Sequence, residues 1–510
     1  MSFNLLKSNY FGEYLGFHAE NIPDKIALTD INGQITYREL YNKSRRVAGL
    51  LNHAGISKGE RIIIALGNTI EQMYFHYGAI LGGYISVPLS SGLSKTRLQS
   101  YIDDSGAACI VKKEAIYDRS HKIIAELDIL ESSEYICSPR KLDDVATIMY
   151  TTGSTGNQKG VMLSHNNLIA ALDHIISYIG YSGNERELVI LPISHSFALG
   201  HVYSNNIMGG YVHLENGMNK MKRVFNAFYK YQITGMPSTP SMVNLFTERY
   251  LEAFKGVADK LNYMVVNTAP LPPESTVKLL SVIPKLRLMI YYGLTEASRS
   301  TFITLSDEDI VNYKSVGKAS KGVKLKIIDG EVCISGKHLF NGYWNKEDET
   351  KSTLINGWMH TGDLGFIDSS GYLTITGRLK EQINIDGLKV APQEVESALL
   401  KCKLVKDIAV VGVIDPLNNK HEVVAALIVS NNNKTDEGRK KDENSSSDDD
   451  EFNVSLAKME EEIKPKIINI LDSLNKNYSK LQKYQIEKLE CLLNSKELSV
   501  SKNKNFKKIQ

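Results

Sequence analysis

Short apolar runs alternate with amphipathic segments through the first third of the chain. Residues 61–66 form one apolar run, and residues 87–89 end a second one. Between them, apolar side chains recur at helical spacing: Ile70, Met73, Tyr74, Tyr77, Ile80 and Leu81. Residues 96–104 predict a further helix, and Asn68 followed by Glu71 resembles a capping box. The pattern predicts the strand–helix alternation of an open, mainly parallel sheet with flanking helices.

This alternation continues to residue 300 and places polar groups directly after three strands. Residues 188–191 and 285–292 are further predicted strands. The loops at 151–160, 192–200 and 293–298 carry hydroxyl, imidazole and carboxylate side chains. Because ligands of open α/β sheets bind outside the ends of strands, these three loops predict one binding site.

Helical spacing fades after residue 315, where alternating segments separated by glycines predict a small β-rich unit. Pro392 then begins a helix whose first turn is acidic. The fold class is therefore α/β, with a large N-terminal domain (1–379) and a smaller α+β C-terminal domain (380–510). Within the smaller domain, the charged low-complexity stretch 431–453 predicts a disordered insert.

The composition is that of an ordinary globular protein and excludes several functional classes. Of the 510 residues, 42% are hydrophobic, and the net charge is only +2, so a nucleic acid partner is not expected. The five cysteines are widely spaced and never form CxxC, which suits a reducing, cytoplasmic location. The sequence predicts neither a signal peptide nor a membrane-spanning helix.

One glycine- and hydroxyl-rich stretch, Tyr150 to Gly160, has the composition of a polyphosphate-binding loop. Glycines allow backbone N–H groups to approach an anion closely, while hydroxyls and a lysine add donors. It is not a Walker A loop, since Gln158 stands where that motif has glycine. The candidate phosphate-binding residues are Thr151, Thr152, Gly153, Ser154, Thr155, Gly156 and Lys159.

Further motifs follow this loop in an order that resembles the adenylate-forming enzymes, a superfamily that includes acyl-CoA synthetases. The motifs are Tyr150 to Gly160, Tyr292-Gly-Leu-Thr-Glu296, Trp358-Met-His-Thr-Gly-Asp363, Gly377-Arg-Leu-Lys-Glu381, Gly387, and Pro392-Gln-Glu-Val-Glu396. They span roughly residues 24–400, and their shared order makes the resemblance specific.

The resemblance implies an ATP-dependent acid–thiol ligase that forms acyl-AMP and then an acyl thioester. The first step brings a carboxylate to the anionic α-phosphate of ATP, so it requires Mg²⁺, lysines and oriented N–H donors. By resemblance, the expected roles are Mg²⁺ binding by Glu296, α-phosphate binding by Thr295, adenine stacking by Tyr292, and ribose binding by Asp363 with Arg378 nearby. The thiol is external, on coenzyme A or on the phosphopantetheine of an acyl carrier protein.

The same resemblance assigns residues to the acid and to the second step, and it assigns a lysine that reaches the α-phosphate in the first step. His195 is expected beside the carboxylate pocket, and Gly293 leaves room there for a longer acyl group. Lys504, with Lys502 as the alternative, is the expected catalytic lysine of the C-terminal tail. Lys380 occupies the hinge position, and Gly387 belongs to the segment expected to reach the pantetheine.

The acid itself stays open between several classes. Residues 194–197 contain no aspartate to pair with an ammonium group, which favours a medium- or long-chain fatty acid over an amino acid. Asn267 and Tyr291 depart from the common pattern of the superfamily and are expected to narrow the adenine and acyl pockets. The alternatives are an aryl- or amino-acid adenylation enzyme that loads a carrier protein, and a non-catalytic relative that binds acyl groups or nucleotide. The oligomeric state is not predicted.

Overall fold

The computed structural model describes residues 3–113, 115–126, 136–138, 140–152, 158–218, 220–267, 271–305, 314–385, 388–400, 405–414 and 422–430. The chain divides into two compact units, residues 1–380 and 381–510. In the part of the chain that is described, no helix is long and apolar enough to span a membrane.

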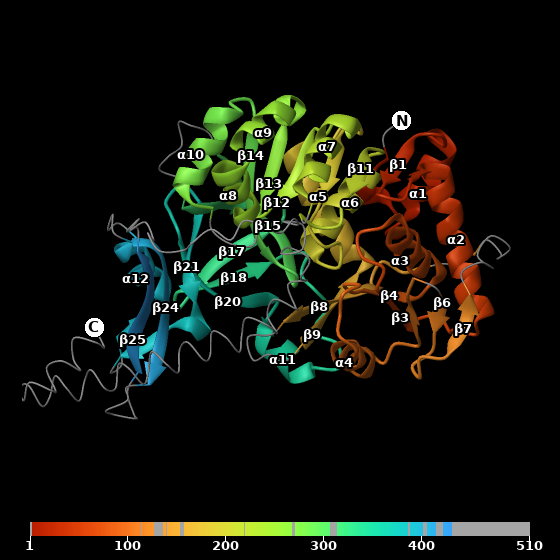
Figure 1. Ribbon diagram of the computed structural model, residues 1–510. Coiled ribbons are helices and arrows are strands. Elements are labelled where there is room, and N and C mark those ends of the chain that lie inside the picture. Colours follow the sequence, from red (N-terminus) through yellow and green to blue (C-terminus); the bar gives the residue numbers. More distant parts are fainter. Residues whose placement is uncertain are drawn as a thin grey trace, which may run out of the picture. The chain divides into compact units, whose positions relative to one another are not determined.

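The elements of the first unit alternate along most of its length (Figure 1). The helices are α1 (Glu13–Asn21), α2 (Tyr37–His53), α3 (Ile70–Gly82), α4 (Lys95–Ser105), α5 (His165–Ile179), α6 (Ser196–Ile207), α7 (Met221–Tyr231), α8 (Pro240–Arg249), α9 (Leu251–Val257), α10 (Pro273–Val282) and α11 (Glu347–Thr353). The strands of the larger sheet are β1 (Ile26–Thr29), β2 (Gln34–Thr36), β10 (Arg186–Val189), β11 (Tyr211–Leu214), β12 (Gly235–Ser238), β13 (Tyr263–Val266), β14 (Arg287–Leu294), β15 (Ala297–Leu305), β16 (Ser315–Ala319), β17 (Lys324–Ile328), β18 (Glu331–Ser335), β19 (Leu354–Ile355), β20 (Trp358–Ile367) and β21 (Leu373–Arg378). Those of the smaller sheet are β3 (Arg61–Ile64), β4 (Ile85–Pro88), β5 (Cys109–Val111), β6 (Ala115–Tyr117), β7 (Ile123–Glu126), β8 (Val145–Thr152) and β9 (Gln158–Ser164).

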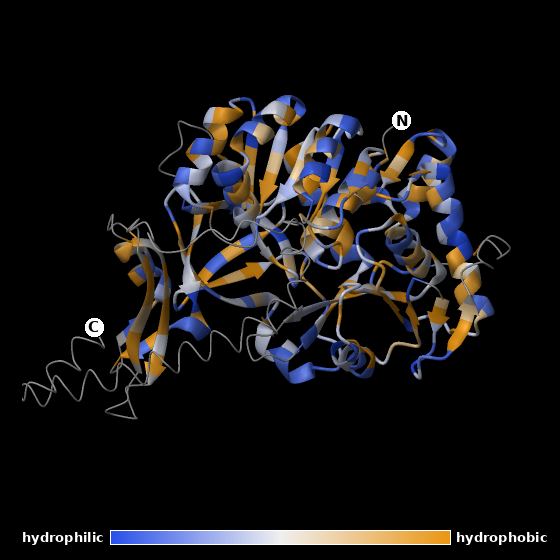
Figure 2. Cartoon of the chain, in the orientation of Figure 1, coloured by the Kyte–Doolittle hydropathy of each residue, from blue (hydrophilic) through white to orange (hydrophobic). Residues whose placement is uncertain are grey.

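The larger sheet is parallel at its centre and antiparallel beyond β14. Its order within the described residues is β17-β18-β20-β21-β16-β15-β14-β13-β12-β10-β11-β1-β2. Alternate side chains of its central strands enter different cores, as the strand period of two requires. Val265 packs into the core shared with α5 and α6, whereas Met264 and Val266 pack into the core formed with helices α7 to α10. The central strands are accordingly hydrophobic on both faces (Figure 2).

The smaller sheet has the order β7-β6-β5-β3-β4-β8-β9. Helix α5 packs against β9 of this sheet and β15 of the larger one, so it lies between the two (Figure 1). Its start is fixed locally, because the Ser164 hydroxyl accepts the Asn167 N–H and the Asn167 side chain bonds back to Ser164 N–H. The end of β9 is thereby joined directly to a helix that reaches the other sheet.

The second unit contains a short hairpin, β22 (Ile383–Ile385) with β23 (Leu388–Val390), followed by helix α12 (Pro392–Leu399). Pro392 occupies the first turn of that helix, as the sequence predicts. Strands β24 (Val405–Ile414) and β25 (Glu422–Ser430) form an antiparallel pair. The predicted insert at 431–453 lies outside the described residues.

The predicted α/β class is confirmed, and one local expectation is corrected. Thr69 caps α3 in place of Asn68, and its hydroxyl accepts the Gln72 N–H at 3.1 Å. The alternating segments after residue 315 form strands, as the sequence predicts. Since β16 pairs with β15, they continue the larger sheet, which is therefore mixed.

Candidate active site

The predicted phosphate loop is the turn of an antiparallel hairpin. Strands β8 and β9 pair Thr151 with Lys159 and Thr152 with Gln158, so both ends of the predicted loop are strand residues. The hairpin is anchored outside the sheet because the Tyr150 hydroxyl donates to Asp104 Oδ2 at 2.6 Å. The turn itself, with Gly153, Ser154, Thr155 and Gly156, lies outside the described residues, and its role stays a prediction.

The segment 339–344 connects this hairpin to the predicted loop at 293–298. Trp344 N–H donates to the carbonyl of Gly160 at 2.7 Å, and Phe340 N–H donates to the carbonyl of Glu296 at 2.9 Å. Isolated bridges also pair Tyr343 with Val161 and Leu339 with Ala297. One stretch of backbone thus holds Lys159 and Glu296 in a fixed relation, although they are distant in the sequence.

Glu296 and Lys159 meet through the side chain of Tyr343. The Tyr343 hydroxyl donates to Glu296 Oε1 at 2.8 Å, and Lys159 Nζ lies 4.7 Å from the centre of the Tyr343 ring. Glu296 is only 7% exposed, and burial raises its pKa even though Tyr343, Lys159 and Arg378 favour the charged form. A buried carboxylate therefore stands beside a cation, and the sequence analysis did not identify Tyr343, which joins them.

A second carboxylate is held by Tyr292 and Arg378. Strands β20 and β21 place Asp363 opposite Arg378, and Arg378 Nε lies 3.0 Å from Asp363 Oδ1. The Tyr292 hydroxyl donates to Asp363 Oδ2 at 2.7 Å. Asp363 is 4% exposed, so these contacts fix its carboxylate in one orientation. The structure brings together three residues that the sequence assigned to ribose and adenine binding.

The hairpin of β14 and β15 carries both Tyr292 and Glu296. Gly293 lies where the hairpin is tight, since an ideal Cβ there would be 2.6 Å from Arg299 N and 2.7 Å from the Ala297 carbonyl oxygen. The backbone therefore requires glycine at this position whatever the length of the acyl group. The expected role of Gly293 in acyl length stays a prediction.

Thr295 and His195 lie near the start of helix α6. The hydroxyls of Thr295 and Ser196 are 3.4 Å apart, within hydrogen-bonding distance. His195 is the N-cap residue of α6, but its side chain makes no capping hydrogen bond, and it is exposed. Its expected place beside the acid's carboxylate stays a prediction.

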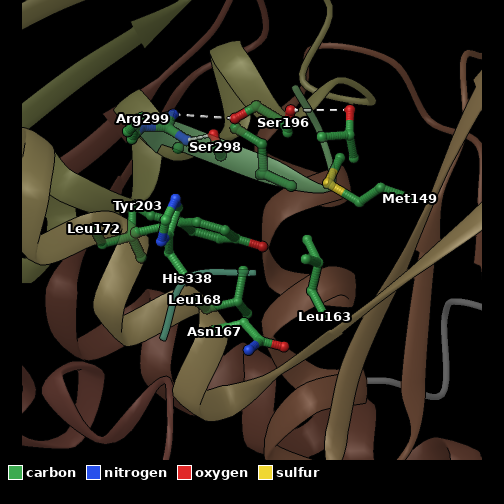
Figure 3. A pocket seen from close by; sticks show the side chains of 14 residues that line it. Met149, Leu163, Asn167, Leu168, Leu172, Ser196, Tyr203, Ser298, Arg299 and His338 are labelled. Carbon is green, nitrogen blue, oxygen red and sulfur yellow. Dashed lines mark hydrogen bonds between the residues drawn. The ribbon is translucent and has the colours of Figure 1, made fainter. Parts of the chain in front are cut away.

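A small cavity adjoins Thr295. Its wall is mainly apolar and comes from β8, β9, α5, α6 and β15 (Figure 3). The lining residues are Met149, Leu163, Asn167, Leu168, Ala171, Leu172, Ser196, Leu199, Gly200, Tyr203, Thr295, Ser298, Arg299 and His338. In the figure, Arg299, Ser298 and Ser196 lie together on one side. The Tyr203 hydroxyl contacts the buried His76 Nε2.

The residues expected to act from the C-terminal domain are not placed by this geometry. Lys504, its alternative Lys502, and Gly387 lie outside the described residues. Lys380 is the last residue of the first unit, within a short 3₁₀ turn (Leu379–Glu381). Its role as a hinge stays a prediction.

Comparison with known families gives the arrangement an evolutionary context. Residues 17–344, more than half of the chain, match the AMP-binding enzyme family. The chain belongs to this family. Residues 394–480 of this AMP-binding enzyme further match the AMP-binding enzyme C-terminal domain. The resemblance to adenylate-forming enzymes is confirmed.

Curated relatives of this AMP-binding enzyme are CoA ligases that differ in their acids. It is 28% identical to a 2-succinylbenzoate–CoA ligase of Bacillus velezensis over 78% of this chain and 84% of that one. It is also 28% identical to 4-coumarate–CoA ligase 1 of Narcissus pseudonarcissus, over 80% and 83%, respectively. Identity to the long-chain-fatty-acid–CoA ligase FadD13 of Mycobacterium tuberculosis is again 28%, over 76% and 81%.

A solved structure agrees with these sequence matches. It is o-succinylbenzoate CoA synthetase from Bacillus subtilis in complex with its acyl-adenylate intermediate, with a TM-score of 0.72 and 26% identity. The match covers 82% of this chain and 88% of that one. This AMP-binding enzyme is an ATP-dependent, AMP-forming acid–thiol ligase of the acyl-CoA synthetase type.

Proposed function

We propose that this enzyme activates a carboxylic acid with a hydrocarbon body and transfers the acyl group to the thiol of coenzyme A. The observation that carries the proposal is a pair of buried carboxylates linked by the β14–β15 hairpin, which carries Glu296 and the Tyr292 that holds Asp363. Glu296 is held by Tyr343 beside Lys159, and Asp363 is held by Tyr292 and Arg378. The first group suits a metal–polyphosphate, and the second suits a ribose.

In this proposal, Asp363 accepts hydrogen bonds from the two ribose hydroxyls, since a carboxylate offers acceptor positions on both oxygens. Lys159 neutralises phosphate charge at the hairpin. Thr295, whose hydroxyl is already near Ser196, donates to the α-phosphate. Each of these groups stabilises charge that develops while the acid's carboxylate attacks phosphorus and pyrophosphate leaves.

The residues at Glu296 fit a magnesium ion. Mg²⁺ prefers oxygen ligands and is bound in such sites by one or two carboxylates together with substrate phosphates. Glu296 supplies a buried carboxylate, and Lys159 stands nearby for the phosphates. The ion would neutralise the negative charge on the phosphate oxygens.

The rate of pyrophosphate release should fall as the pH is lowered, with a midpoint above the ordinary pKa of glutamate, about 4.3. Burial raises the pKa of Glu296, so the carboxylate becomes protonated at a higher pH as the solution is acidified. Because Mg²⁺ binds only the charged carboxylate, a higher Mg²⁺ concentration should move the midpoint of this loss of rate to lower pH. Initial rates measured against pH at two Mg²⁺ concentrations test this. If the midpoint is the same at both Mg²⁺ concentrations, the loss of rate comes from the protonation of another group.

The hydrocarbon body is supported by the wall of the cavity beside Thr295, where Leu163, Leu168, Leu172 and Leu199 are apolar. Medium- and long-chain fatty acids have such a body, as the sequence predicts. Among the described lining residues there is no Asp or Glu to pair with an ammonium group. The cavity therefore favours acids without an amino group.

A screen of acid-dependent pyrophosphate release, with and without coenzyme A, tests the function. Fatty acids, 2-succinylbenzoate, 4-coumarate and amino acids form the panel. We expect release with at least one of the first three classes, and thioester formation when coenzyme A is present. Exchange with amino acids alone would indicate a carrier-loading adenylation enzyme. Binding of ATP and acid without any release would indicate a non-catalytic relative.

A further inference from the structure

Arg299 is a buried cation with only neutral partners. It is 2% exposed. Its Nη2 donates to the carbonyls of Ser196 at 3.1 Å and Phe197 at 3.2 Å, and its Nη1 donates to the Ser298 hydroxyl. Its Nε has no hydrogen-bond partner, and within the described ranges no Asp or Glu forms an ion pair with it. Since burying an unpaired charge is costly, Arg299 lacks, among the described residues, the carboxylate that would balance it.

The surrounding chain is built to keep the guanidinium in this place. Helix α6 has Gly200 against it, and an ideal Cβ there would lie 1.8 Å from Arg299 Nη2. Arg299 itself has φ of +64°, a conformation that non-glycine residues seldom adopt and that is often retained at functional sites.

Tyr291, where the superfamily commonly has glycine, adds to this environment. Its ring centre lies 5.7 Å from the guanidinium carbon of Arg299, and its hydroxyl interacts with the side chain of Asn267. Burial raises the pKa of Tyr291 to about 12, so it contributes no negative charge at neutral pH. The two departures from the family pattern, Asn267 and Tyr291, thus accompany the buried arginine without neutralising it.

Arg299 lines the same cavity as Thr295 (Figure 3). Ser196 contacts both, because its hydroxyl is near Thr295 and its carbonyl accepts from Arg299. An acid whose activated carboxylate lies at Thr295 therefore places the rest of its body along the wall that contains Arg299. Tyr203 and Ser298 also line this wall, and their hydroxyls contact His76 and Arg299, respectively.

We propose that Arg299 binds a second carboxylate of the substrate, and that the enzyme activates dicarboxylic acids in preference to the corresponding monocarboxylic acids. This rests on the proposed function, because it assigns the cavity to the acid. A guanidinium suits a carboxylate through its planar set of charged donors, and the Nε–H is still available. The apolar wall would contact the hydrocarbon between the two carboxylates.

The first test compares matched acids on the wild-type enzyme. Straight-chain dicarboxylates from succinate to dodecanedioate, and 2-succinylbenzoate, are each paired with the monocarboxylate of the same carbon skeleton. Because a hydrogen bond to a charged group is worth about one to two powers of ten in binding, kcat/KM should favour the best diacid by on the order of 10–100-fold. A wild-type enzyme that prefers every monoacid would overturn the proposal, and this comparison needs no variant.

Substitutions then assign the preference to Arg299. In Arg299→Met, the ratio of kcat/KM for diacid over monoacid should fall to about one, and Arg299→Lys should recover part of it. Arg287→Met is the matched control, because Arg287 lies on β14, is exposed and donates to the Ile179 carbonyl away from the cavity. Its ratio should equal that of the wild type. If Arg299→Met slows both acids equally, Arg299 only ties α6 to β15.

Calorimetric binding of the best diacid separates this inference from the proposed function. Arg299-dependent binding without pyrophosphate release would retain the inference and refute the function. Pyrophosphate release with diacid binding that is unchanged in Arg299→Met would retain the function and refute the inference. Thermal melting of each variant identifies any that fails to fold, in which case the wild-type comparison decides.

Discussion

Glu296→Gln is expected to lower acid-dependent pyrophosphate release by on the order of 10³-fold. Glutamine has the shape of glutamate, and its amide oxygen can still accept the hydrogen bond that the Tyr343 hydroxyl donates to Oε1. The substitution therefore removes the charge and leaves the packing of this 7% exposed side chain largely in place. Initial rates at saturating ATP and acid, over a range of Mg²⁺ concentrations, measure the effect.

Tyr343→Phe is the control for Glu296→Gln. It removes the hydroxyl but keeps the ring beneath Lys159 and the carboxylate itself. We expect a smaller loss, of about ten-fold, because one neutral donor is lost and the charge is kept. A Glu296→Gln enzyme within ten-fold of the wild type, with an unchanged Mg²⁺ dependence, would show that Glu296 does not hold the metal.

Asp363→Ala is expected to lower kcat/KM for ATP by on the order of 10³-fold. The wild-type carboxylate is oriented by Tyr292 and Arg378 and is 4% exposed, so little reorganisation precedes binding. Two hydrogen bonds from ribose hydroxyls to a charged acceptor, each worth about 1.5–3 kcal/mol, account for this loss.

Deoxy nucleotides make the Asp363 prediction specific. The wild type should discriminate strongly against 2′-deoxy-ATP and 3′-deoxy-ATP, whereas Asp363→Ala should use all three nucleotides about equally. Arg378→Met is the matched control. Arg378 is 57% exposed, so its ion pair contributes little, and discrimination should persist in this variant. Equal discrimination in Asp363→Ala and the wild type would place the ribose elsewhere.

Local sequence patterns predicted the helices and strands better than the residues at which they end and the segments that they contact. The apolar stripe from Ile70 to Leu81 correctly predicted α3, which is buried along nearly its whole length. Asn68 was the wrong cap because its amide donates to the carbonyls of Leu191 and Glu215, both at 2.9 Å. These partners are far away in the sequence, so no local pattern could show that they compete with the cap.

Long-range pairing also determines how the predicted β-rich segments are joined to the rest of the N-terminal domain. Alternation along residues 323–335 and 372–376 predicted strands correctly, because each strand has its own period of two. The pairing of Thr301 with Ala319, which joins these strands to the larger sheet, is not encoded in any short window. The single mixed sheet therefore emerged only from the structure.

In the candidate site, the sequence predicted residues that act through their side chains but not those that act through their backbone. Glu296, Asp363 and Lys159 act through side chains of distinctive chemistry, so motifs could suggest them. The segment 339–344 acts through N–H and carbonyl groups that any residue possesses, and it left no signal. Arg299 could have been noticed, since it stands three residues after Glu296, but its burial and its unpaired Nε are visible only in three dimensions.

The most direct measurement for the central claim is a crystal structure with a non-hydrolysable acyl-adenylate analogue. The account predicts both ribose hydroxyls within hydrogen-bonding distance of Asp363, the phosphate mimic beside Thr295, and the acyl group in the cavity lined by Leu199 and Arg299. An analogue bound away from Asp363, or an acyl group directed out of that cavity, would contradict the account.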